Sequence, residues 1–324
     1  MTSVLYCNNY AATEQAVENV KNGLYPRHHL WGIYELCNSD QFFINFSESP
    51  DMSLHKSRIV RLVITFLYEI KIFKKFHKID VVYAACTHQI DFFAFMKCIK
   101  LFKGRLMVVV HHPKRIPFSK HYQKIICISR YTEKYLRDKY GILNTEYLFW
   151  GPDLAFYHKY KENSEKKYDF YLNGKTLRDF NLVADAFRRC DYKVLALQNM
   201  MGEGKKVQAV SDVENIRFCC LSKIMLIPIK SGILQICGLT SLIDALALEM
   251  PFIISDSANL GFSELEVKEM LGGTVYKAGD KQDFLEKLKD SIEHYKPNIA
   301  GLAFILANNY EHFRTRILQL ITSK

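Results

Sequence analysis

The sequence predicts an α/β protein in which two domains each contain a parallel sheet flanked by helices. The apolar run Ile224–Ile229 is short and β-branched, as is typical of a strand buried on both faces. A helical pattern of apolar residues follows Gly238, Pro251 ends it, and Phe252–Ser255 is predicted to be the next strand. Strand, helix, strand units of this kind build parallel sheets. A chain of 324 residues is long enough for two domains of about 100 to 200 residues each.

The start of the helix after Gly238 is a candidate anion site. Thr240 or Ser241 is expected to cap this helix, and Asp244 lies three residues after Ser241, as in a capping box. The unpaired amides and the positive dipole end of the helix would point to the sheet edge where ligands of open parallel sheets bind. Gly238 would let the backbone approach a phosphate closely, and the Thr240 and Ser241 hydroxyls would add donors. A helix capped for stability, with nothing bound, explains the same pattern.

The first half of the chain shows the same alternation of strands and helices. His111 and His112 directly follow the buried strand predicted at Leu106–Val110, at the sheet edge where chemistry usually takes place. One of them is a candidate catalytic residue. It would act either as a proton shuttle or as a hydrogen-bond donor to a substrate or to the reaction centre. A packed or surface histidine remains the alternative. Further strands are predicted at Val4–Tyr6, Phe42–Phe46, Asp80–Cys86, Lys124–Ser129, Asp169–Leu172 and Tyr192–Leu197.

The most amphipathic stretch is His55–Lys78, where apolar residues recur at helical spacing from Ile59 to Phe73 with arginines and lysines among and after them. The pattern favours a helix that packs its apolar face on the N-terminal sheet. A helix that lies on a membrane surface is the alternative, and both hold if only the basic end faces anionic lipid.

The net charge of +10 is concentrated in the first half of the chain. Residues 1–155 carry 21 Lys and Arg against 13 Asp and Glu, or +8, whereas residues 156–324 carry 23 against 21, or +2. A basic surface suits nucleic acid, anionic lipid or phosphorylated substrates alike. No aromatic-rich reading motif accompanies the charge, so nucleic acid is the least favoured of these partners.

Several observations indicate a cytoplasmic protein. No apolar run approaches the roughly 18 residues of a membrane span, and the N-terminus lacks the pattern of a signal peptide. The nine cysteines are scattered in apolar contexts and are not spaced as a disulfide framework. We therefore expect a cytoplasmic location, including a peripheral one on the inner face of the membrane.

Residues 244–253, DALALEMPFI, resemble the donor-binding motif of the large retaining, sucrose-synthase-like family of GT-B-fold glycosyltransferases, typically Glu-Ala-x-Ala-x-Gly-x-Pro-Val-Ile. Asp244 stands where that family has Glu, and Glu249 stands where it has Gly. Ile236 occupies a position where the family often has a Glu that contacts the donor sugar. Because of these departures, the resemblance does not indicate which sugar is recognised or whether the reaction retains or inverts the configuration.

Two further segments carry the resemblance. Trp150–Asp153 stands where the family passes from one domain to the next, and Gly174, Lys175 and Arg178 stand where a glycine and basic residues precede a helix that helps to hold the diphosphate. The Arg fork and the Lys point charge both suit phosphate, although a solvated helix start fits these residues too. The resemblance further implies that Asp244 accepts hydrogen bonds from a ribose hydroxyl.

The resemblance implies the GT-B fold, with two Rossmann-like domains that face each other across a cleft. The expected limits are 1–155 for the acceptor domain, 156–305 for the donor domain, and 306–324 for a C-terminal helix that crosses back to the first domain. The expected reaction moves a sugar from a nucleotide diphosphate, with a UDP-sugar favoured, to a hydroxyl acceptor, including a lipid-linked one, without metal or cofactor. A sugar-nucleotide epimerase and a non-catalytic glycosyltransferase-like subunit are the alternatives.

Overall fold

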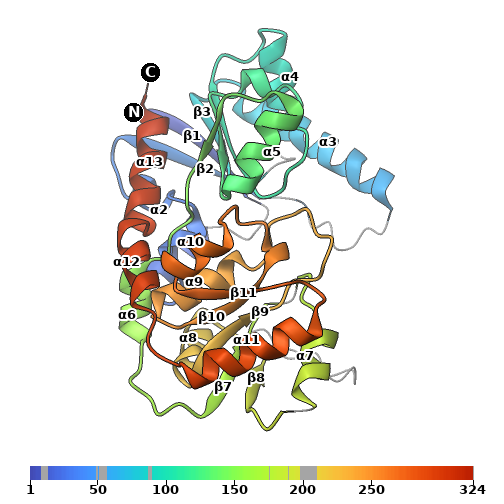
Figure 1. Ribbon diagram of the computed structural model, residues 1–324. Helices are drawn as coiled ribbons and strands as arrows, with labels where there is room; N and C mark the ends of the chain where they lie inside the picture. Colours follow the sequence, from blue (N-terminus) through green and yellow to red (C-terminus); the bar gives the residue numbers. More distant parts are fainter. Residues whose placement is uncertain are drawn as a thin grey trace. The chain divides into compact units, whose positions relative to one another are not determined.

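The computed structural model describes residues 1–8, 14–48, 50, 57–86, 90–174, 176–188, 190–197 and 210–323. They form two compact units (Figure 1). Unit 1 comprises Met1–Trp150 together with Phe313–Lys324, and unit 2 comprises Gly151–His312. Within the described ranges, no helix is both long enough and apolar enough to cross a bilayer.

Unit 1 contains a six-stranded sheet in the order β2-β1-β3-β4-β5-β6, and every pair of neighbouring strands is parallel. The central strands β3 and β4 are rich in Val and are buried on both faces, as is usual when helices cover a parallel sheet. The strands are β1 (Thr2–Asn8), β2 (Phe42–Glu48), β3 (Val81–Ala84), β4 (Arg105–Val110), β5 (Lys124–Cys127) and β6 (Thr145–Tyr147). The helices are α1 (Glu14–Lys21), η1 (Arg27–Leu30), α2 (Tyr34–Cys37), α3 (Arg58–Phe76), α4 (Asp91–Cys98), η2 (Ser119–His121) and α5 (Arg130–Tyr140).

Unit 2 contains a five-stranded sheet in the order β11-β10-β9-β7-β8, again with parallel neighbours throughout. The strands are β7 (Tyr168–Leu172), β8 (Val194–Ala196), β9 (Ser222–Ile227), β10 (Phe252–Ser255) and β11 (Gly273–Tyr276). The helices are α6 (Leu154–Tyr160), α7 (Phe180–Phe187), α8 (Asp212–Cys220), α9 (Leu239–Ala247), η3 (Asp256–Ala258), α10 (Glu264–Glu269), α11 (Lys281–Glu293) and α12 (Ile299–Ala307).

The two sheets confirm the predicted α/β class. β10 has the predicted bounds, and β11 is a strand that the sequence pattern did not reveal. Helix α9 is buried at nearly every position, which agrees with its apolar sequence. The predicted cap of α9 is wrong. The helix begins after Gly238, which takes the N-cap position with a φ of 85° and makes no side-chain cap, so neither Thr240 nor Ser241 caps it.

The last helix, α13 (Tyr310–Thr322), confirms that the chain returns to its first unit. Phe313 and Ile317 are fully buried there. Arg316 forms an ion pair with Glu146 of β6, with an Nη2 to Oε2 distance of 2.9 Å. Buried apolar contacts and this bidentate pair therefore hold the end of the chain on unit 1.

Gly151 marks a close approach of two backbone segments in unit 2. A Cβ atom placed on it would lie 2.0 Å from the carbonyl oxygen of Asn308 and 2.5 Å from the carbonyl carbon of Asn309. The neighbouring backbone is bonded as well, because the Tyr310 amide donates to the Pro152 carbonyl at 2.9 Å. Only glycine fits at this crossing.

We predict that Gly151→Ala destabilises the protein by about 3 kcal/mol, because the obstructing atoms are backbone and cannot turn aside. Gly141→Ala is the control. Gly141 has a φ of 62°, but a Cβ there would meet nothing within 4 Å, so only the backbone strain of about 1 kcal/mol applies. Urea unfolding of both variants checks this, and equal losses would contradict the steric argument.

Candidate functional site

Arg178 is held between the loops that follow two neighbouring strands, β7 and β9. It forms an isolated antiparallel bridge with Ile229. On either side of that bridge the Asp179 amide donates to Pro228 at 2.8 Å, and the Lys230 amide donates to Leu177 at 3.0 Å. The carboxyl ends of β7 and β9 are thereby joined at the sheet edge where ligands of such sheets bind.

Asp179 acts as the cap of α7. Its Oδ1 accepts a hydrogen bond from the Leu182 amide at 3.1 Å. The helix that follows Arg178 is therefore fixed at its first turn, and Arg178 is fixed with it.

The Arg178 guanidinium is buried and positively charged. Its side chain is only 5% exposed. Nη2 donates to Ser241 Oγ at 2.7 Å, Nε to the Asn173 carbonyl at 3.2 Å, and Nη1 to the Thr176 carbonyl at 3.4 Å. Burial lowers its pKa to about 10, so it stays protonated at neutral pH.

The charge of Arg178 has no counterion among the described residues, none of whose carboxylates forms an ion pair with it. The same residues account for three of the five guanidinium N–H groups. A buried, unpaired cation is unfavourable, so a site of this kind gains stability when an anion binds. This arrangement suits an anion, and the role of Arg178 in donor binding stays a prediction.

Two glycines lie against this guanidinium, and both have a positive φ. A Cβ at Gly174, with φ of 83°, would lie 2.5 Å from Arg178 Nη2. A Cβ at Gly238, with φ of 85°, would lie 2.4 Å from Ile227 Cγ2 and 3.8 Å from Arg178 Nη1. The structure thus brings Gly174, Arg178, Gly238 and Ser241 together. Thr240 is exposed in the first turn of α9, and Lys175 lies outside the described residues.

Asp244 is the centre of a buried hydrogen-bond network beside Arg178. Its Oδ1 accepts from Tyr157 Oη at 2.6 Å, and its Oδ2 accepts from Asn173 Nδ2 and Asn215 Nδ2, both at 2.9 Å. The side chain is 3% exposed, and burial raises its pKa to about 6 while the three hydrogen bonds oppose that rise. The network ties α9 to α6, to α8 and to the loop after β7. The ribose contact implied by the resemblance stays a prediction.

Sequence reasoning missed two members of this network, Tyr157 and Asn215. Tyr157 and Asn215 lie in segments to which the sequence analysis assigned no role. Asn173, which directly precedes Gly174, carries one further feature. Its Oδ1 is buried and accepts no hydrogen bond from the described residues, so it is available to a hydroxyl donor.

The two candidate catalytic histidines lie in unit 1, directly after β4. His111 Nε2 is 2.8 Å from the Ala85 carbonyl oxygen, and its ring meets Trp31 edge to face at 5.0 Å. Because a carbonyl only accepts, Nε2 carries the proton and Nδ1 is an acceptor. Burial lowers the pKa of His111 to about 4, so the ring is neutral at pH 7. His112 is half-buried beside it. Their catalytic role stays a prediction.

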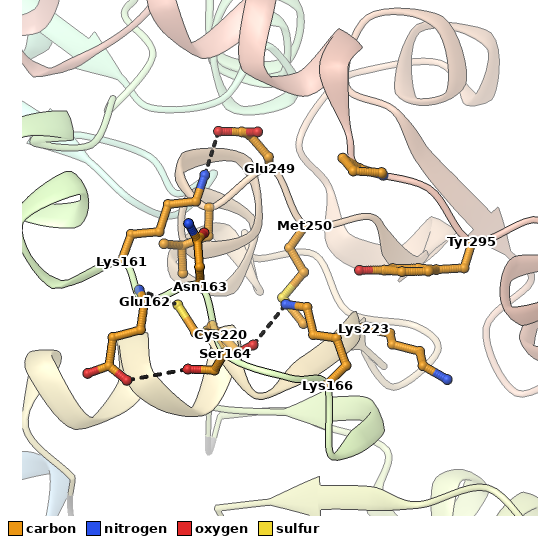
Figure 2. A pocket seen from close by; sticks show the side chains of 13 residues that line it. Lys161, Glu162, Asn163, Ser164, Lys166, Cys220, Lys223, Glu249, Met250 and Tyr295 are labelled. Carbon is orange, nitrogen blue, oxygen red and sulfur yellow. Dashed lines mark hydrogen bonds and ion pairs between the residues drawn. The ribbon is translucent and has the colours of Figure 1, made fainter.

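Unit 2 also contains a pocket of about 170 Å³ that is separate from Arg178. Figure 2 shows its lining, in which Lys161 reaches Glu249 at 2.6 Å and Lys166 reaches the Cys220 carbonyl at 2.8 Å. Lys166 and Lys223 line it at the amino ends of β7 and β9. Arg178 follows the carboxyl end of β7, which is the opposite sheet edge. The described residues contain no group of three His, Cys, Asp or Glu side chains placed to hold a metal ion.

Glu249, which replaces the glycine of the resembling motif, has the backbone conformation that favours glycine. It lies two residues after the end of α9 with a φ of 55°. Helices commonly end with a glycine in this left-handed conformation. The ion pair with Lys161 in Figure 2 and a 2.8 Å hydrogen bond from the Asn298 amide to the Glu249 carbonyl hold it there.

No protein-family model matches the sequence, and no curated protein matches it. Solved structures match the fold over almost the whole chain. A glycosyltransferase of Rickettsia africae has 13% identity and a TM-score of 0.64, with 99% of this chain and 97% of that chain covered. Sucrose-phosphate synthase of Thermosynechococcus elongatus has 11% identity and a TM-score of 0.69, with coverage of 99% and 98%. HepE of Anabaena in complex with UDP-glucose has 12% identity and a TM-score of 0.62, with both chains covered in full.

The chain has the GT-B fold. At such identities the likeness concerns the fold alone. Arg178 and the start of α9 lie at the carboxyl edge of the sheet in unit 2. The sequence analysis predicted the donor site in this unit.

We predict that Glu249→Gly leaves this GT-B protein about 1 kcal/mol more stable than Glu249→Ala does, because both variants lose the ion pair and only alanine retains the backbone strain. Melting temperatures measure the difference. At Glu286, inside α11, the order should be reversed, since glycine disfavours a helix interior. The same order at both positions would argue against strain at Glu249.

We predict that the stability of the wild type, measured against Asp244→Asn, falls by roughly 3 kcal/mol as the pH rises from about 4 to about 6. The folded pKa of Asp244 is raised, so the folded state binds the proton more tightly than the unfolded state in this window. The asparagine amide can donate to Tyr157 while its oxygen accepts from Asn173 and Asn215, so the variant keeps the network. Chemical unfolding at several pH values tests this.

The comparison between two proteins is necessary because His111 acts in the opposite direction. Its pKa is lowered to about 4, so its contribution to stability is lost as the pH falls below about 6.5. That contribution cancels in the difference between wild type and Asp244→Asn. A difference that does not change with pH would show that Asp244 is ionised throughout the range.

Proposed function

We propose that this protein is a glycosyltransferase that moves a sugar from a nucleotide diphosphate, with UDP favoured, to a hydroxyl acceptor in the synthesis of cell-surface polysaccharide or glycolipid. The observation that carries the proposal is the buried Arg178 guanidinium, which has no carboxylate partner among the described residues and lies beside Ser241 at the start of α9. The GT-B fold and the solved complex of HepE with UDP-glucose support a UDP-sugar as donor.

The first step of the mechanism is binding of the diphosphate. The remaining N–H groups of Arg178 suit a phosphate oxygen pair, since a guanidinium binds such anions in bidentate fashion. Ser241 Oγ already accepts from Arg178, which leaves its own proton to donate to the same anion. Gly238 lets the backbone approach closely, and the free amides of the first turn of α9 add donors. Lys175 and Thr240 are proposed as further donor contacts.

The chemical step is cleavage of the bond between the anomeric carbon and the diphosphate. Negative charge grows on the leaving diphosphate as this bond breaks, and fixed donors around it lower the barrier most when little water is present. Arg178 and Ser241 supply that stabilisation from buried positions, so the proposed reaction requires no metal. Asn173 Oδ1 is proposed to accept a hydrogen bond from a hydroxyl group of the donor.

The acceptor side is assigned to unit 1. With Nε2 held by the Ala85 carbonyl, His111 offers Nδ1 as a hydrogen-bond acceptor to an incoming hydroxyl. Its pKa of about 4 keeps the ring neutral at pH 7 and makes it a weak base, so its proposed role is to orient the hydroxyl. His112 is the second candidate. If the reaction retains the anomeric configuration, the leaving phosphate takes the proton instead. We place the enzyme in the cytoplasm, where nucleotide sugars would reach it.

A non-catalytic glycosyltransferase-like subunit is the second candidate. Ile236 and Glu249 favour it, because they replace a sugar-contacting Glu and a Gly of the motif that the sequence resembles. Such a subunit would bind the nucleotide and would never release a transfer product.

We predict that Arg178→Gln weakens binding of UDP at least tenfold, because the variant loses the buried charge and both free N–H groups. Thermal shift measures this, since a ligand at 100 times its dissociation constant stabilises a protein by about 2.7 kcal/mol. Arg188→Gln is the control, since Arg188 is exposed near the end of α7 and pairs with Asp185. His111→Gln should leave UDP binding unchanged.

The outcomes separate the candidates. Product analysis with a UDP-sugar panel distinguishes transfer from mere binding, and the appearance of an epimerised sugar nucleotide would identify the epimerase. If Arg178→Gln and Arg188→Gln bind UDP as tightly as the wild type, the donor site is elsewhere and the assignment fails.

A further inference from the structure

Helix α3 of unit 1 buries only its second half. Ile72 is 6% exposed there, and Phe73 packs against Phe93 and Phe102 at ring distances of 5.2 and 6.3 Å. The first half is different. Its large apolar side chains are between 41% and 74% exposed: Ile59, Val60, Leu62, Val63, Phe66 and Leu67. The prediction that this helix packs its apolar face on the sheet is therefore correct for the second half only.

Figure 1 shows the first half of α3 extending beyond the sheet of its own unit. Its exposed side chains recur at helical spacing from Ile59 to Phe66, so they form one stripe. A stripe of this size is unusual on a water-facing helix, where single exposed apolar residues are normal and a contiguous patch marks an interaction surface.

A row of phenylalanine rings continues the stripe over two further elements. Phe66 meets Phe92 at 5.8 Å, Phe92 meets Phe95 of α4 at 6.2 Å, and Phe95 meets Phe118 at 5.6 Å. Phe95 and Phe118 are 39% and 41% exposed, and Phe118 has a φ of 53° that few side chains adopt. We call this surface the apolar face; it comprises Ile59, Val60, Leu62, Val63, Phe66, Leu67, Phe95 and Phe118.

The segment that carries the apolar face is strongly basic. Residues 57–120 contain 13 Lys and Arg against 3 Asp and Glu, or +10, which equals the net charge of the whole chain. The three acids are engaged inside unit 1. Glu69 accepts from the Phe92 amide at 2.6 Å, Asp80 from the Ser3 amide at 2.7 Å, and Asp91 from Tyr122 Oη at 3.4 Å. The exposed cations of the segment include Arg61, Lys71, Lys100, Lys114, Arg115 and Lys120.

We propose that the apolar face docks on the surface of a bilayer that contains anionic lipids. Apolar and aromatic side chains enter the boundary between headgroups and acyl chains, while neighbouring cations bind the headgroups, and here both kinds of side chain occur in one segment. No described helix can span a bilayer, so α3 would lie in the plane of the interface. The proposal does not rest on sugar transfer.

Charge decides against the other occupants of this surface. A second copy would bring another +10 segment against the first in a symmetric dimer, and the two would repel each other. Nucleic acid would satisfy the cations but would leave the exposed leucines and isoleucines without a suitable partner. An anionic bilayer satisfies both the charges and the apolar side chains.

The test is co-sedimentation of the full chain with vesicles of phosphatidylcholine alone or with about one third phosphatidylglycerol. We expect binding to the anionic vesicles that weakens as salt is raised, and much weaker binding to the neutral ones. Leu62→Ser/Leu67→Ser should reduce binding at least tenfold. The matched control is Leu24→Ser/Leu143→Ser, because these leucines are 58% and 79% exposed against 62% and 59% for the first pair.

A second pair of variants tests the charges. Lys114→Gln/Lys120→Gln should reduce binding to anionic vesicles by about fivefold for each charge, whereas Lys134→Gln/Lys139→Gln, on the exposed side of α5, should have little effect. Absence of vesicle binding, or equal losses in the test and control pairs, would overturn the proposal. Light scattering could instead show a dimer that Leu62→Ser/Leu67→Ser converts to a monomer and that the control pair leaves intact. That result would assign the apolar face to a second copy of the chain and would also overturn the proposal.

Discussion

The contacts between loops at the carboxyl edge of the unit 2 sheet converge on one buried positive charge. Arg178 ties the loop after β7 to Ser241 in α9 through a 2.7 Å hydrogen bond, and the backbone bridge to Ile229 holds both loops in register. The acidic side chain of α9, Asp244, does not pair with this guanidinium but accepts hydrogen bonds from Tyr157, Asn173 and Asn215. The two networks meet only at Asn173, whose carbonyl accepts from Arg178 and whose amide donates to Asp244, so no direct ion pair neutralises the guanidinium.

The elements of the fold were readable from local patterns. Short β-branched runs such as Leu106–Val110 and Phe252–Ser255, with proline or glycine near their ends, favour buried strands. The strand Gly273–Tyr276 was missed because it begins with glycine and has only one aliphatic residue, Val275. The cap of α9 was misassigned for a reason of conformation. Gly238 adopts a left-handed backbone, so the hydroxyl of Ser241 is left for Arg178.

The site was only partly readable. Arg178 and Ser241 were both predicted, because each carries chemistry that suits a phosphate, although 63 positions separate them. Tyr157 and Asn215 could not be predicted from the sequence, because only the tertiary structure brings these side chains to Asp244. The same limit applies to α3. A periodic apolar pattern shows that one face avoids water, but it does not distinguish a sheet from a lipid surface, and the structure shows that the two halves of the helix differ.

Helix α9 carries a charge of unfavourable sign at each end. A cation lies at its amino end, where the backbone dipole is already positive, and Glu249 follows its carboxyl end, where the dipole is negative. Lys161 forms an ion pair with Glu249 at the carboxyl end. At the amino end, no described carboxylate pairs with Arg178. An anion bound at Arg178 would thus relieve the dipole of the whole helix as well as the single charge. Anion binding should then slow amide hydrogen exchange along α9, as far as the turn that contains Glu249.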